Sequence, residues 1–146
     1  MIKSILKLLA GWFKPPSKPE ITFYEVDSAS VINEITGMKV SIPFGMQDNI
    51  YYYTTEWGWR QAVDYVRKVY NFPPYEAEVR DCDFFALLMK ALVEHHFGLT
   101  TCGYTNGMSP LGSHAFNKVR TDTGWKDLEP QTGKFVENYV SNKVLL

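Results

Sequence analysis

This chain has, in order along its sequence, a cysteine, a histidine and a carboxylate, whose side chains could pass one proton between them. Cys82 comes where a long apolar segment begins, and His114 and Glu129 follow it in short polar contexts. A thiol becomes a strong nucleophile when a nearby base takes its proton and a third group orients that base. The order therefore predicts a cysteine nucleophile, with Cys82, His114 and Glu129 as the candidate catalytic residues.

The expected position of Cys82 at a helix start favours the thiolate. Asp81 is a suitable N-cap, and the apolar residues that follow predict a buried helix over about 81–97, with Gly98 as its C-cap. Free N–H groups and the positive end of the helix dipole stabilise a negative sulfur. The backbone N–H of Cys82 also points out of the helix end, where an oxyanion would bind.

Whether His114 and Glu129 meet depends on the register of one hairpin. A turn at Asp122-Thr123-Gly124 separates predicted strands over 113–121 and 125–129. With a two- or four-residue loop, His114 and Glu129 lie on one face as diagonal neighbours, about 5–8 Å apart at Cβ. A three-residue loop would place them on opposite faces.

Other polar residues near the thiol are candidates for supporting roles. A second oxyanion donor would be Gln131, Asn117 or Tyr75, and Gln131 is favoured because it is expected opposite His114. No cofactor is required by this chemistry. A metal site built from Cys82, His114 and Glu129 is an alternative, but it lacks the paired ligand spacing typical of zinc sites.

Acidic residues crowd around the cysteine. Such charges raise the pKa of a thiol unless a cation neutralises them. Arg80 supplies part of the neutralising positive charge. The acidic residues are then expected either to form a rim in contact with solvent or to bind calcium near Asp81 and Asp83. The acidic residues in question are Glu76, Glu78, Asp81 and Asp83.

The order of the predicted elements indicates an α+β fold, with helices first and an antiparallel sheet after them. The second helix is capped by Thr54 or Thr55 and stopped by Pro73-Pro74. Helices are expected over 29–35, 54–70 and 81–97, and strands over 21–26, 40–44, 99–104, 113–121, 125–129 and within 135–146.

The first nineteen residues are expected to form a separate unit. Residues 1–19 read as an amphipathic helix followed by a proline-rich linker, and residues 20–146 as the main domain. The helix would pack on its own domain, dock on a protein partner or lie on a membrane surface. It has no convincing signal-peptide pattern and is too short to span a bilayer, so the expected location is cytoplasmic or stays unknown.

The overall composition is that of an ordinary globular domain. The chain has 146 residues, of which 45% are hydrophobic and 21% charged, and its formal net charge is −1. Without a basic run, nucleic acid is excluded as an expected partner. Only two cysteines, Cys82 and Cys102, are present, which is too few for a disulfide scaffold.

Three segments resemble the papain-like and transglutaminase-like cysteine peptidase superfamily, and most closely the cysteine-protease domain of fungal agglutinins. They are Asp-Cys-Asp-Phe-Phe-Ala from residue 81, Gly-Ser-His-Ala-Phe-Asn from 112 and Gly-Trp-Lys-Asp-Leu-Glu-Pro-Gln from 124. The match covers roughly 57–133. It implies a papain-like fold, with a central helix that carries the nucleophile and packs on an antiparallel sheet.

By this resemblance the protein is expected to be a cysteine peptidase that cleaves amide bonds in a protein or peptide. Cys82 would be the nucleophile, His114 the base and Glu129 the residue that orients it. Papain has a glutamine oxyanion donor before its cysteine, where this chain has Glu76. The alternatives are a peptidoglycan cross-peptide amidase or transamidase, and an inactive papain-like module that docks through its N-terminal helix.

Overall fold

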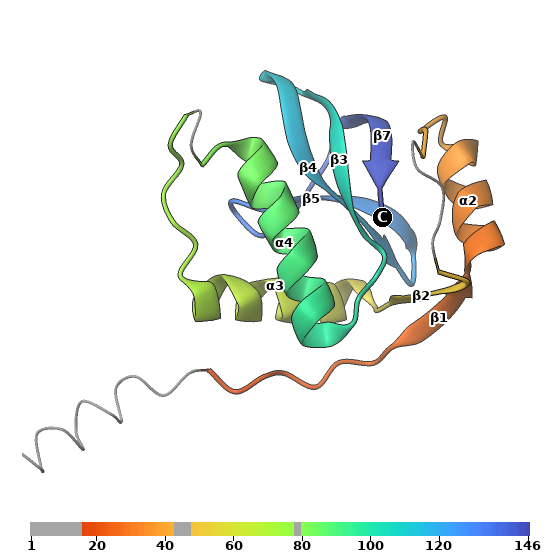
Figure 1. The fold of residues 1–146 in the computed structure, drawn as a ribbon, viewed down its shortest axis with the longest axis horizontal. Helices are drawn as coiled ribbons and strands as arrows, with labels where there is room; N and C mark the ends of the chain where they lie inside the picture. Colours follow the sequence, from red (N-terminus) through yellow and green to blue (C-terminus); the bar gives the residue numbers. More distant parts are fainter. Residues whose placement is uncertain (1–15, 43–47, 78–79) are drawn as a thin grey trace, which may run out of the picture.

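The computed structural model describes residues 16–42, 48–77 and 80–146, and it has three helices and two antiparallel sheets within them (Figure 1). The expected α+β class is confirmed. The helices are α2 (Ser28–Gly37), α3 (Glu56–Tyr70) and α4 (Cys82–Phe97). The small sheet pairs β1 (Tyr24–Asp27) with β2 (Ile50–Tyr53). The large sheet has the order β6-β5-β4-β3-β7, with β3 (Cys102–Ser109), β4 (Gly112–Thr121), β5 (Gly124–Glu129), β6 (Lys134–Val136) and β7 (Val140–Leu145).

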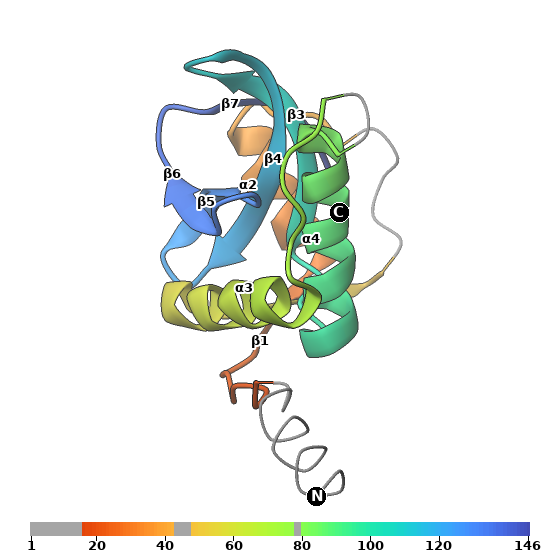
Figure 2. The same cartoon turned by 90° about the vertical axis from the view of Figure 1, so that its left-hand side faces the viewer.

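Helix α4 has both of the predicted caps. The Asp81 side chain accepts a hydrogen bond from Phe84 N at 3.3 Å, and Gly98 ends the helix in the left-handed conformation with φ of 67°. Glycine adopts that conformation without steric cost. The buried side chains of α4 pack on β3 and β4, and Figures 1 and 2 both show the helix lying along these strands.

Helix α3 completes the main core. Thr55 caps it by accepting from Gly58 N at 3.0 Å, as predicted for Thr54 or Thr55. Its apolar side packs against α4 and against the sheet residues Val119 and Leu128. The α3 side chains in this core are Trp59, Ala62, Val63 and Val66.

The small sheet and α2 form a second apolar cluster with Val144 of β7. In Figure 1, α2 lies beyond β7, away from α4. The Arg120 guanidinium ties α2 to the large sheet, because it donates two hydrogen bonds of 2.8 Å to the Glu34 carboxylate. Trp125 Nε1 donates to the same carboxylate at 2.8 Å.

The hairpin between β4 and β5 has the register that places His114 and Glu129 on one face. Arg120 pairs with Trp125 and Thr121 with Gly124, so the loop has two residues. The segment 135–146 differs from the prediction, since it contains two strands rather than one. Strands β6 and β7 lie at opposite edges of the sheet but are joined by residues 137–139 alone, so the sheet must curl strongly.

Two predicted segments fall partly or wholly outside the described residues. The amphipathic helix predicted for the N-terminus lies there, as do residues 43–44 of the strand predicted over 40–44. Of the described residues of this segment, Ser41 forms an isolated bridge to Lys143. Strand β2, by contrast, was not predicted. Among residues 16–42, 48–77 and 80–146, no helix has the length and apolar character that a bilayer crossing requires.

Candidate functional site

The histidine and the glutamate of the predicted triad are hydrogen-bonded. His114 Nε2 donates to Glu129 Oε2 over 2.6 Å, and the two side chains are only 18% and 11% exposed. Glu129 also accepts from the backbone N of Gln131 at 3.2 Å and from the Tyr139 hydroxyl at 3.3 Å. A carboxylate with three donors is held in one orientation, and it fixes the imidazole ring in turn.

Aromatic rings pack around this pair. The Tyr139 ring lies edge-on to His114, with centroids 5.7 Å apart and an interplanar angle of 88°. The Phe116 ring stacks with the His114 ring, with centroids 6.3 Å apart, and its centroid lies 5.0 Å from that of Tyr139. Burial, with a smaller effect of the Glu129 charge, raises the pKa of the Tyr139 hydroxyl. Sequence reasoning did not find Tyr139, since it lies in no motif.

Cys82 is the first residue of α4 and is half-buried. The helix is fixed at this end by two hydrogen bonds, from Asn117 Nδ2 to Ala86 O at 2.9 Å and from the Tyr104 hydroxyl to Asp83 Oδ1 at 3.0 Å. In Figures 1 and 2, α4 begins toward the end of the sheet where β3 turns into β4. Cys82 and His114 therefore lie toward the same end of the molecule, although no hydrogen bond joins them within the described residues.

Most of the acids around Cys82 have partners of their own. Arg80 forms a salt bridge with Glu76, Asp81 caps α4, and Asp83 accepts from Tyr104. Within the described part of the chain, no group of three or more His, Cys, Asp or Glu side chains is arranged to hold a metal ion. Calcium near Asp81 and Asp83 stays a prediction.

The candidates for a second oxyanion donor are in different situations. The buried amide of Asn117 is already bonded to Ala86 O and to Gly103 O, so it is used in packing. Tyr75 is 58% exposed. The backbone of Gln131 is fixed, because its carbonyl accepts from Arg67 at 2.7 Å and its N–H donates to Glu129. Its side-chain role stays a prediction.

The second cysteine is in a very different environment from the first. Cys102 is fully buried in the main core, and this burial raises the pKa of its thiol to about 12. A thiol with such a pKa carries almost no thiolate at neutral pH and reacts slowly. Cys102 therefore serves as an internal control for any reaction at Cys82.

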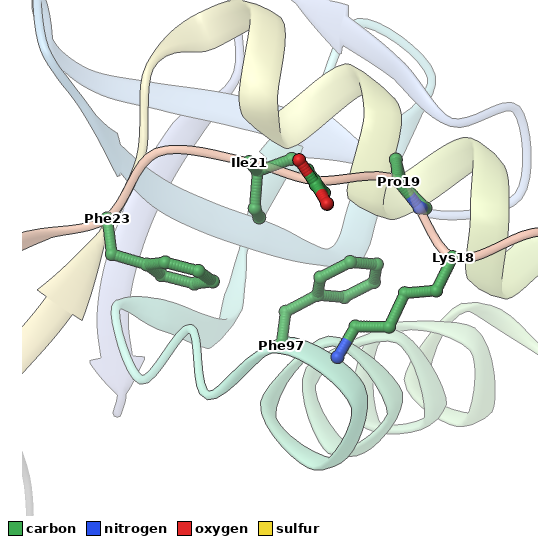
Figure 3. A pocket seen from close by; sticks show the side chains of 6 residues that line it. Lys18, Pro19, Ile21, Phe23 and Phe97 are labelled. Atoms are coloured by element: carbon green, nitrogen blue, oxygen red, sulfur yellow. The ribbon is translucent and has the colours of Figure 1, made fainter.

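A pocket lies at the other end of α4. It has a volume of about 450 Å³ and is lined by Lys18–Ile21, Phe23 and Phe97 (Figure 3). The Lys18 ammonium lies 5.0 Å from the centre of the Phe97 ring. A sixteen-residue helix is about 24 Å long, so this pocket is separate from the Cys82 site.

Aromatic residues of β2 and of the start of α3 differ in their exposure. Trp59 and Tyr51 are buried, whereas Trp57 is 69% exposed. They therefore do not form a single binding surface.

No family model matches the chain, and no curated protein matches it. The solved structures that are similar in fold include two with nearly the same TM-score. One is a complex of PSL1a with E64, with a TM-score of 0.66, 20% identity and coverage of 84% of this chain and 50% of the other. The second is the Polyporus squamosus lectin bound to the human-type influenza-binding epitope Neu5Aca2-6Galb1-4GlcNAc, with a TM-score of 0.67, 20% identity and coverage of 84% and 49%.

These comparisons correct the assignment made from the sequence. The similar structures are those of a lectin. This finding shows that the prediction of a papain-like and transglutaminase-like cysteine peptidase was wrong. The predicted cysteine peptidase activity is corrected with it, and so are the alternatives of a peptidoglycan amidase or transamidase and an inactive papain-like module. Over most of its length, the chain is similar in fold to about half of a Polyporus squamosus lectin.

Proposed function

We propose that the chain carries a nucleophilic thiol site, where Cys82 forms a covalent bond with an electrophilic ligand and His114 accepts the thiol proton. The observation that carries this proposal is the 2.6 Å hydrogen bond from His114 Nε2 to Glu129 Oε2. Because Nε2 holds the hydrogen, the neutral ring has its lone pair on Nδ1. That nitrogen is the one that can accept a proton from a thiol.

The proposed step is a simple displacement. Cys82 Sγ forms a bond to an electrophilic carbon of the ligand, and the thiol proton moves to His114 Nδ1. The electron pair of the broken bond departs with the leaving group, which then takes the proton from His114. Glu129 stabilises the imidazolium that exists between these two proton transfers.

The fold supports this site through α4. The proposal includes the predicted arrangement in which a central helix carries the nucleophile and packs on the antiparallel sheet. The free N–H groups of the first turn favour the thiolate of Cys82. The bonds of Asn117 to Ala86 O and of Tyr104 to Asp83 support a fixed position for that turn. The domain bounds, 20–146 after a unit of residues 1–19, stay part of the proposal.

The proposal is tested by the selectivity of thiol labelling. Iodoacetamide at pH 7 in limiting amount is expected to modify Cys82 at least tenfold faster than Cys102, because Cys102 is buried with a pKa of about 12. Peptide mass mapping of the native chain gives the ratio, and Cys82→Ser and Cys102→Ser assign the two sites. Equal labelling of both thiols, or none at Cys82, would overturn the proposal.

E64, the ligand of the PSL1a complex, provides a second probe of the same site. If this chain binds it at Cys82, E64 added first protects Cys82 from iodoacetamide. The protection is measured by the same mass mapping.

Carbohydrate binding is a second proposed function, favoured by the oligosaccharide in the similar lectin structure. Trp57 is an exposed ring next to Glu56, which forms salt bridges with Arg60 and Lys126. Flat rings beside polar groups are suited to binding sugars. Titration calorimetry with Neu5Aca2-6Galb1-4GlcNAc should then show binding that Trp57→Ala removes. The chain spans about half of that lectin. An absence of binding heat would therefore indicate that the ligand binds to the half of the lectin that this chain does not cover.

A further inference from the structure

We infer that Tyr139 is a positioning residue of the thiol site, because it holds Glu129 and the His114 ring in the orientation that leaves Nδ1 free for the thiol. This inference rests on the proposed function. The Tyr139 hydroxyl donates to Glu129 Oε2 at 3.3 Å, and this is the same oxygen that accepts from His114 Nε2 at 2.6 Å. Tyr139 thus contacts both members of the pair.

The ring of Tyr139 restricts His114 as well. Its plane is nearly perpendicular to the imidazole, with ring centroids 5.7 Å apart, and it also packs on the fully buried ring of Phe116, with centroids 5.0 Å apart. Phe116 also stacks on the imidazole. The imidazole therefore has an aromatic neighbour on two sides and a carboxylate at Nε2, which leaves few orientations open to it.

The fold explains how Tyr139 comes to this place. It belongs to the short connection 137–139 between β6 and β7, which lie at opposite edges of the curled sheet. Asn138, directly before it, has φ of 64°, a conformation that asparagine tolerates better than most residues. The connection places Tyr139 against His114 and Phe116 of β4 and Glu129 of β5.

The charged side chains near the His114–Glu129 pair are not hydrogen-bonded to Glu129 among the described residues. Asp127, which also acts on the Tyr139 hydroxyl, forms a salt bridge of 2.5 Å with Lys118. Lys134 lies opposite Glu129 in the β5–β6 pairing. Neither lysine is hydrogen-bonded to Glu129 among the described residues, so the neutral donor Tyr139 is the side chain besides His114 that binds this carboxylate.

The test is the titration of His114 by NMR in the full chain with ¹⁵N-labelled histidine. In Tyr139→Phe the ring is kept, but Glu129 Oε2 loses a donor and binds the imidazolium more strongly. The midpoint of the His114 titration in this variant is expected to move to higher pH than in the unaltered chain. Tyr70→Phe is the matched control, since it removes a hydroxyl hydrogen-bonded to His96 Nε2 at 2.8 Å and should leave His114 unchanged. An unaltered His114 titration in Tyr139→Phe would overturn the inference.

A kinetic measurement separates this inference from the proposed function. The pH dependence of Cys82 labelling should shift in Tyr139→Phe in the same direction as the His114 titration and stay unchanged in Tyr70→Phe. If the NMR titration moves but labelling responds neither to Tyr139→Phe nor to His114→Ala, the thiol site is wrong and the functional role of Tyr139 falls with it.

Discussion

A His114→Ala chain is expected to react at Cys82 about tenfold more slowly than the unaltered chain when dithiodipyridine, a disulfide reagent, is added at pH 6. Without the imidazole, a thiol with an ordinary pKa of about 8.5 is only roughly 0.3% ionised at this pH. If His114 takes the thiol proton completely in the unaltered chain, the concentration of thiolate there is about 300-fold higher. A thiolate of lower basicity is a weaker nucleophile, and this offsets roughly 20–30-fold of that gain. About tenfold is left as the contribution of the imidazole.

The control for this variant is His95→Ala. His95 lies in the last turn of α4, at the far end of the helix from Cys82, and its side chain is exposed. The rate in that variant should equal that of the unaltered chain, as followed by the absorbance of the released pyridinethione. If His114→Ala also reacts at the unaltered rate, His114 does not act as the base.

Trp59→Ala is expected to lower the free energy of unfolding by about 3–5 kcal/mol. Trp59 is fully buried where α3, α4 and the large sheet meet, and its indole N–H donates to Arg120 O at 2.6 Å. The substitution leaves a cavity in the core and also a buried carbonyl without its donor. Urea unfolding followed by circular dichroism measures the change.

The matched control for the core is Trp57→Ala, two residues away on the same helix. Trp57 is 69% exposed, so its replacement should change the free energy of unfolding by less than about 0.5 kcal/mol. Similar losses in the two variants would contradict the packing of α3 described above.

The elements that carry the site were predictable because local signals define them. Asp81 and Gly98 determine the ends of α4, and the short turn after Thr121 sets the β4–β5 register. The sequence left the length of the loop open, and only a two- or four-residue loop was expected to place His114 and Glu129 on one face. The structure has the two-residue loop and joins the two side chains by a hydrogen bond.

The parts that were missed depend on tertiary structure. Tyr139 reaches the site because the sheet curls, and the weakly alternating sequence of 135–146 does not show that its strands lie at opposite edges. Strand β2 is stabilised by pairing with β1 and not by a pattern of its own. The family assignment relied on short segments around single residues, and such segments do not determine what a fold is used for.

The most direct test of the thiol site is the pH dependence of the reaction of Cys82 with dithiodipyridine between pH 5 and 9, measured in Cys102→Ser. An imidazole that takes the thiol proton keeps the thiolate present at low pH. For the proposed thiol site, the rate is expected to be already high at pH 6 and to rise little toward pH 9. A rate that follows a single ionisation near pH 8.5 would contradict it, because Cys82 would then be an ordinary thiol.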